Sequence, residues 1–207
     1  MTEQRREGRR EAVSEHKRGL ILKAAREVFE AEGLEGASLR AIAARAGYTP
    51  AALYFHFDSK EAIYAEVLRA SLTALGKSVN AAAAKARDPN ARLRGAALAF
   101  FRFYADNPRD LDLGFYLFRG GMKPAGLGRE RDEELNAALE AALHPIADAA
   151  EVLGASKVEA NLLMVDVFAH AAGLLLLLHT GRIRMFAAPA STLMEDYIRY
   201  RMARVGK

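Results

Sequence analysis

The residues best suited to chemistry lie in one short segment, SLRAIAARAGYTPAALYFHF, from Ser38 to Phe57. Its polar groups are of the kind that bind a polyanion. Tyr54 and His56 are aromatic residues with polar tips that can reach phosphates, and Ala51 leaves the start of its helix with little bulk, so that it can approach a groove floor. The segment therefore predicts a nucleic-acid-binding surface.

Two short helices, residues 38–46 and 50–57, must position these side chains. Where two helices cross steeply, the crossing point needs a small residue and the turn needs one that tolerates positive φ. Ala43 and Gly47 meet these needs, four residues apart. The pattern favours a helix-turn-helix, although Ala-x-x-x-Gly also occurs in ordinary helical hairpins. Ile42, Ala46 and Leu53 would form its buried face.

The start of the second helix is well marked. Thr49 is placed to cap it, and Pro50 occupies the first turn, where a missing N–H costs nothing. Arg40 lies on the exposed side of the first helix and is the candidate for reading a base, because arginine can bind guanine through two hydrogen bonds. The alternative for Arg40 is a solvated surface side chain.

The wider region from Ile21 to Leu68 resembles the DNA-binding head of the tetracycline-repressor (TetR/AcrR) family. The resemblance is carried by ILKAAREVFEAEGLEGASL, then IAARAG, LYFHF and SKEAI, and it covers roughly the first third of the chain. One departure is Pro50-Ala51-Ala52, which lacks the polar side chains that many members use to read bases.

The resemblance also implies roles for individual residues. Ser38 and Thr49 would cap helices against phosphates, and Tyr54 and His56 would contact the DNA backbone. Lys60 would pair with a phosphate at the start of the next helix. The predicted DNA-binding set is Ser38, Arg40, Thr49, Pro50, Ala51, Tyr54, His56 and Lys60.

The composition is typical of a soluble globular protein. The chain has 207 residues, 51% of them hydrophobic and 27% charged, and no cysteine. Disulfides and thiolate metal sites are thereby excluded, which suits a reducing compartment. The charged N-terminus has no apolar segment typical of a signal peptide. The apolar stretch 162–178 is short and interrupted by Asp166 and His170, which favours a buried helix over a membrane span.

Helical periodicity dominates, so the predicted class is all-α. We expect a disordered tail at 1–15, with a basic minor-groove arm as the alternative; a three-helix helix-turn-helix domain at 16–60, whose first helix ends at Gly33; and a helical effector-binding and dimerisation domain at 61–207. Expected helix starts are Asp58-Ser59 with Glu61, Asp88-Pro89, Asn107-Pro108, Ser156 with Glu159, and Pro189.

The larger domain is rich in aromatic residues near a glycine-rich stretch, residues 120–128. This stretch lacks the features of a phosphate-binding loop and is expected to be a helix connection. The aromatic residues suit an apolar cavity for a small apolar or aromatic effector, although plain core is the alternative. The residues expected to line it are Phe101, Tyr104, Phe115, Phe118 and His170.

The helix expected at 157–180 is apolar on nearly every face, so both of its sides must be covered. A second subunit is the natural cover for one side, with the last helix completing a symmetric interface. The candidate interface residues are Leu175, Leu176, Leu193 and Tyr197.

No catalytic motif is present, and the five histidines are scattered. We therefore expect no enzymatic activity, no cofactor and no metal site. The predicted function is a homodimeric regulator that binds a palindromic operator in double-stranded DNA, most simply a repressor released by its effector. The alternatives are a helical interaction module without specific DNA binding and an unfamiliar helical enzyme.

Overall fold

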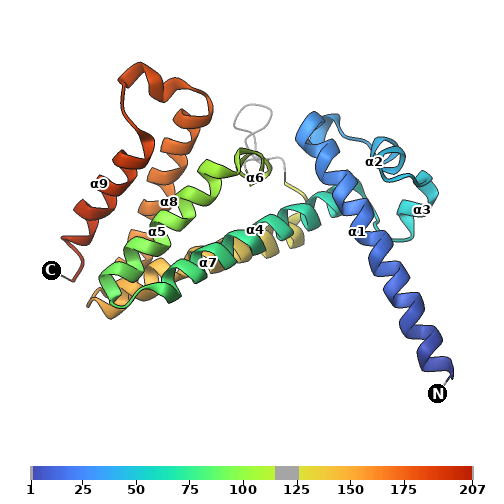
Figure 1. The fold of residues 1–207 in the computed structure, drawn as a ribbon, viewed down its shortest axis with the longest axis horizontal. Coiled ribbons are helices and arrows are strands. Elements are labelled where there is room, and N and C mark those ends of the chain that lie inside the picture. Colours follow the sequence, from blue (N-terminus) through green and yellow to red (C-terminus); the bar gives the residue numbers. More distant parts are fainter. Residues whose placement is uncertain (1, 115–125, 207) are drawn as a thin grey trace. The chain divides into compact units, whose positions relative to one another are not determined.

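A computed structural model describes residues 2–114 and 126–206, and every regular element in those two ranges is a helix (Figure 1). The predicted all-α class is confirmed. In chain order the elements are α1 (Thr2–Gly36), α2 (Leu39–Ala46), α3 (Pro50–Tyr54), α4 (Lys60–Lys85), α5 (Pro89–Asp106), α6 (Pro108–Gly114), α7 (Arg129–Val152), α8 (Lys157–His179), the 3-10 helix η2 (Arg182–Phe186) and α9 (Ala190–Met202).

The chain divides into two compact units, and the division differs from the predicted boundary at residue 60. Unit 1 contains residues 1–70 and 112–133, and unit 2 contains residues 71–111 and 134–207. The helix α4 begins at Lys60 and continues through the division at residue 70, and its first turns contribute Ile63 and Tyr64 to the buried core. The order of the sequence alone does not show that α4 contributes to both units, or that residues 112–133 belong to unit 1.

The disordered tail predicted for residues 1–15 is wrong, because α1 begins at Thr2. Glu, Arg and Gln dominate this stretch and are good helix formers. Extension of a helix that is already packed gains one hydrogen bond per added residue without a new nucleation cost. The predicted stop at Gly33 is confirmed as a break, since φ is +70° there and the helical conformation is interrupted.

Unit 1 is built around the packing of α1 on α2 and of α2 on α3. Phe29 and Tyr64 form an edge-to-face ring contact with centroids 4.8 Å apart. Ile42 and Leu53 are fully buried, as the helix-turn-helix pattern predicted. Ala46 is only partly buried, so it closes the edge of this core.

Unit 2 is held together by α5, α8 and α9, with η2 packed on α8. Phe100 of α5 lies edge-to-face with Tyr104 of the same helix and with Phe168 of α8. The buried set includes Leu93, Phe101, Ile146, Val167, Leu175, Met194 and Ile198.

Most predicted helix starts are confirmed. Asp88 accepts a hydrogen bond from the Ala91 N–H at 2.9 Å, and Ser156 and Glu159 form a complete capping box. Asn107 is an exception: its side-chain amide donates to the Phe103 carbonyl at 2.7 Å. It therefore closes the end of α5 and does not cap α6.

The helix α8 is the one described helix long and apolar enough to cross a membrane by length and composition. Core helices of soluble proteins pass the same test. Here one side of α8 is buried within unit 2, where it packs against α5, α9 and η2.

Candidate nucleic-acid interface

The turn between α2 and α3 has the geometry that the sequence predicted. Ser38 is extended, and its hydroxyl accepts from the Ala41 N–H at 3.1 Å. Gly47 adopts the left-handed conformation, with φ +74°. Thr49 accepts from the Ala52 N–H at 3.3 Å, and Pro50 follows in the first turn of α3. The two caps and the glycine thus fix both helix starts and the turn.

The predicted contact residues lie largely on the surface of this helix pair. Ser38, Arg40, Thr49, Pro50 and Ala51 are exposed. Tyr54 is also exposed, at 61%. We call these six residues, together with Phe55, the α2–α3 face. Its hydroxyl groups and the Arg40 guanidinium can donate hydrogen bonds, which suits a phosphate-rich partner.

Phe55 was missed by the sequence reasoning, although it is the most exposed large apolar side chain among the described residues, at 87%. A signal was present, because Leu53 and Phe57 are four residues apart and both are buried. A residue midway between them must point away from that core. Phe55 can offer an apolar contact where Tyr54 offers a hydroxyl.

Arg40 is available for binding. Within the part of the chain that the structure describes, it has no ion-pair or hydrogen-bond partner and its side chain is exposed. Its neighbour Arg45, by contrast, is paired with Glu27 at 2.6 Å. A free guanidinium on the α2–α3 face is the arrangement that base or phosphate recognition requires.

Lys60 is placed differently from its predicted role. Its ammonium donates to the Leu34 carbonyl at 3.0 Å and to the Ala37 carbonyl at 3.5 Å. These carbonyls lie after the break in α1, where helical partners are missing. Lys60 thus joins the start of α4 to the end of α1, and its predicted phosphate contact stays a prediction.

A second cation, Arg18, was not anticipated. It donates to the His56 carbonyl at 3.1 Å and pairs with Glu66 at 2.9 Å. Its guanidinium also lies 4.4 Å from the centroid of the Phe57 ring. Arg18 therefore holds the end of the LYFHF segment against α1 and α4, which fixes where the half-buried His56 is presented.

The start of α4 differs from its predicted capping box. The Ala62 N–H donates to Ser59 at 3.1 Å, so Ser59 is the cap. Asp58 instead binds Arg131 of α7, which donates to both carboxylate oxygens at 3.0 and 3.2 Å. Nearby in the sequence, Tyr64 donates to the Leu113 carbonyl at 2.8 Å. Leu113 and Arg131 thus contact residues of unit 1 that follow the α2–α3 face in the sequence.

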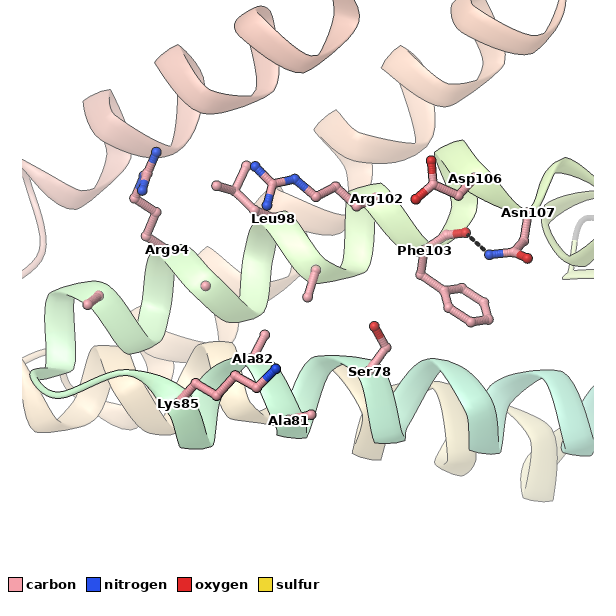
Figure 2. A pocket seen from close by; sticks show the side chains of 13 residues that line it. Ser78, Ala81, Ala82, Lys85, Arg94, Leu98, Arg102, Phe103, Asp106 and Asn107 are labelled. Atoms are coloured by element: carbon pink, nitrogen blue, oxygen red, sulfur yellow. Dashed lines mark hydrogen bonds between the residues drawn. The ribbon is translucent and has the colours of Figure 1, made fainter.

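Three of the residues predicted to line an effector cavity, Phe101, Tyr104 and His170, lie within the described part of the chain, and none of them lines a described pocket. Phe101 and Tyr104 are buried in α5. Burial is the main cause that raises the pKa of Tyr104, and the negative charge of nearby Asp110 adds to it. His170 instead stacks on Tyr197 of α9, with centroids 3.7 Å apart. The predicted Phe115 and Phe118 lie outside the described residues. Figure 2 shows one of the described pockets, a groove along α4 and α5.

His170 is only partly exposed, and no cluster that could hold a metal forms around it. Burial lowers its pKa, while Asp166 opposes this effect by raising it. Asp166 itself pairs with Arg201 at 2.8 Å. No group of three histidine or carboxylate side chains that could hold a metal occurs in residues 2–114 and 126–206.

An apolar surface remains exposed on α8 and α9. Val158, Leu162, Val165 and Leu176 recur on one side of α8, with exposed fractions between 50% and 70%. Leu193 and Tyr200 are exposed on α9, at 38% and 54%. We call these six residues the α8–α9 surface.

The assignment of Leu175 to an interface is wrong. Its side chain is fully buried within its own chain, whereas the adjacent Leu176 is 60% exposed. Leu193 is accessible as predicted, and Tyr197 is half-buried under His170. A helix with no polar face gives no phase signal, so the sequence could not tell Leu175 from Leu176.

Comparison with known proteins agrees with the geometry. Residues 21–67 match the family of bacterial regulatory proteins described as the tetR family. The HTH-type transcriptional activator FasR of Mycolicibacterium smegmatis is 41% identical over 89 residues, which cover 43% of this chain and 41% of FasR. The match thus spans less than half the length of that relative.

Solved structures extend the similarity to most of the chain. A Rhodococcus sp. RHA1 protein gives a TM-score of 0.73 at 20% identity, over 92% of this chain and 96% of its own. PfmR, a TetR-family transcriptional regulator from Thermus thermophilus, gives 0.64 at 21% identity, over 88% and 93%. At such identities the likeness is one of fold. The family match confirms the resemblance over residues 21–67, the region that contains the helix-turn-helix.

Proposed function

Starting from a tetR-family helix-turn-helix at the N-terminus, we propose that this chain is a sequence-specific DNA-binding transcriptional regulator. The observation that carries the proposal is the α2–α3 face. It combines two capped helix starts, a guanidinium without a described partner at Arg40 and two exposed aromatic residues, Tyr54 and Phe55. Exposure of aromatic side chains to water is unfavourable, and this surface is suited to contact with a DNA groove and its phosphates. The site of action is then the cytoplasm.

The proposed regulator acts as a homodimer through the α8–α9 surface. Six exposed apolar residues on two helices are a surface that a second copy can cover. A two-fold axis through such an interface presents two heads, and these read two half-sites in successive major grooves. The expected DNA target is therefore a palindrome.

The regulator responds to a small effector bound by unit 2. An effector that binds the DNA-incompetent arrangement more tightly shifts the population toward it. A coupling of about 1–3 kcal/mol lowers operator affinity by roughly 5- to 150-fold. We propose repression as the outcome of operator binding; FasR is named an activator, and that name applies to FasR.

The test begins with selection of duplexes from a random library by the purified protein. Enriched sequences are then titrated by fluorescence anisotropy. We expect a palindromic motif, and we expect Arg40→Ala to relax one position in each half-site. Arg92→Ala, an exposed arginine of α5, is the matched control. Binding without sequence enrichment would instead support a helical interaction module.

The sign of regulation is tested separately with a reporter. The selected motif is placed across the promoter, and the wild-type chain or Arg40→Ala is supplied in cells. We expect the wild type to lower reporter output and Arg40→Ala to restore it. Increased output with the wild type would overturn repression and leave DNA binding standing.

A further inference from the structure

The first part of α1 forms a projecting arm that the α2–α3 face does not include. Figure 1 shows this part of the helix extending beyond α2 and α3, with no other element of unit 1 beside it. Residues 7–17 are all exposed. From Thr2 to Lys17 the helix rises roughly 23 Å. We call residues 2–17 the α1 arm.

Charge is divided between two sides of the α1 arm. A helix turns by about 100° per residue, so residues three, four and seven apart share a side. One side carries carboxylates, and the opposite side carries cations around a single valine. The acidic side consists of Glu7, Glu11 and Glu15, and the basic side consists of Arg9, Arg10, Val13, His16 and Lys17.

This division is unfavourable for a helix that has no partner. Glu7, Glu11 and Glu15 are four residues apart, and like charges at that spacing repel. Arg9 and Lys17 have no carboxylate three or four residues away in either direction. Their side chains have no ion-pair or hydrogen-bond partner in the part of the chain that the structure describes. The basic side is therefore open to an external anion.

The two sides of the arm lead to different neighbours in unit 1. Residues seven apart lie almost on one line along a helix, with a drift of about 20°. Val13 of the basic side is two such steps before Glu27, which pairs with an arginine of α2 at 2.6 Å. Glu11 of the acidic side is one step before Arg18, which pairs with a glutamate of α4 at 2.9 Å. The basic side thus continues the side of α1 that binds α2.

We propose that the basic side of the α1 arm binds the phosphate backbone of the DNA that is seated on the α2–α3 face. A helix with its side chains is about 10–12 Å wide and cannot enter a minor groove about 6 Å wide, so the arm lies against phosphates. The inference rests on the proposed function, because the arm adds contacts to the same DNA.

A membrane fits this surface less well than DNA does. The exposed apolar residues on this side of α1 are Val13, at 48%, and Leu20, at 41%. Two such residues are too few to form the apolar face by which a helix enters a membrane interface. The cations, by contrast, match a polymer that carries one negative charge about every 1.7 Å along its axis.

The first test compares operator binding by the wild type and by the triple variant Arg9→Gln, Arg10→Gln and Lys17→Gln over a range of salt concentrations. Each phosphate contact contributes about 0.9 to the slope of log affinity against log salt, so the triple variant should lower the slope of the dimer by roughly 2–5 units. Operator affinity should fall about tenfold or more at low salt. The selected motif should be unchanged, because phosphate contacts carry no sequence information. The matched control removes three exposed cations of unit 2, through Lys77→Gln, Arg87→Gln and Arg92→Gln.

A second pair of variants keeps every charge and turns the arm. Two alanines inserted between Lys17 and Arg18 rotate the arm by about 200°, whereas four alanines leave it rotated by about 40°. The first insertion should bind the operator as weakly as the triple variant, and the second should stay close to the wild type. Circular dichroism and thermal unfolding check that each variant keeps the fold.

The outcomes separate this proposal from the proposed function. Wild-type affinity and salt slope in the triple variant would overturn the role of the arm and leave sequence-specific DNA binding standing. An equal loss in the control variant, or wild-type affinity with two inserted alanines, would show an effect of net charge and also overturn it. If the triple variant loses only binding to vesicles of phosphatidylcholine and phosphatidylserine, the partner is a membrane and the proposal is wrong. If the wild type binds no duplex, both proposals fail.

Discussion

Two adjacent leucines on α8 give the sharpest test of the proposed dimer. Leu176 is 60% exposed, and Leu175 is fully buried in its own chain. Leu176→Glu should therefore separate the subunits without unfolding them. Leu175→Glu should unfold the chain, because an unpaired charge would be buried in the core.

The size of the effect follows from the exposed area. Complete burial of a leucine side chain is worth about 1.5–3 kcal/mol, so covering the exposed 60% of Leu176 contributes roughly 1–2 kcal/mol per chain. Two-fold symmetry doubles this to about 2–4 kcal/mol per dimer. The dimer dissociation constant should then rise by roughly 30- to 700-fold, before any cost of desolvating the new carboxylate.

Analytical ultracentrifugation across a concentration series measures this constant, and circular dichroism reports whether each variant is folded. Leu20→Glu is the matched control, since Leu20 is 41% exposed on α1 in the other unit. It should leave the dimer unchanged. The reasoning is refuted if Leu176→Glu is folded and dissociates within threefold of the wild type, or if the wild type is monomeric at micromolar concentration.

Four further outcomes are expected. Arg40→Ala should cost roughly 1–3 kcal/mol in operator binding and relax one position per half-site; an unchanged preference in duplex selection would remove Arg40 from base reading. Lys60→Met should lower the free energy of urea unfolding by about 1–3 kcal/mol, because two carbonyls lose a charged donor. Wild-type stability would show that those bonds contribute little. A double-mutant cycle of Asp58→Asn with Arg131→Met should give a coupling of about 0.5–1 kcal/mol, since the Asp58 side chain is 74% exposed; additive effects would argue against the pair. Because the pKa of His170 is lowered in the folded chain, the unfolded chain takes up a proton at this residue at a higher pH than the folded chain does. The free energy of unfolding should therefore decrease as the pH falls below about 6.5. His170→Gln should reduce the change in melting temperature between pH 7 and pH 5. A pH dependence equal to that of the wild type would contradict this expectation.

The sequence predicted correctly those features that depend on interactions between residues close together in the chain. Caps at Ser38, Thr49 and Asp88 involve a side chain and an N–H only three residues away. The left-handed turn at Gly47 likewise depends on one residue. These features could be read from spacing alone, and with them the helix-turn-helix.

Contacts between distant residues could not be predicted in this way. Lys60 is bound to carbonyls 23 and 26 residues earlier, and Asp58 is bound to an arginine 73 residues later. Both looked free in the sequence, so one was assigned to phosphate and the other to a capping box. The predicted effector residues stay a prediction, because aromatic density in the sequence does not reveal which way Phe101 or Tyr104 faces.

The return of later residues to unit 1 has a consequence for synthesis of the protein. Tyr64 is nearly fully buried and donates to Leu113, 49 residues further along, and Asp58 binds the still later Arg131. Domains generally fold as units as the chain emerges from the ribosome, N-terminal first. Here the N-terminal unit cannot close its last contacts until residue 131 has emerged. By then all of α5 and α6 has been made. The head and the first half of the body must therefore mature together, and a nascent chain stopped before α7 would expose an incomplete DNA-binding unit.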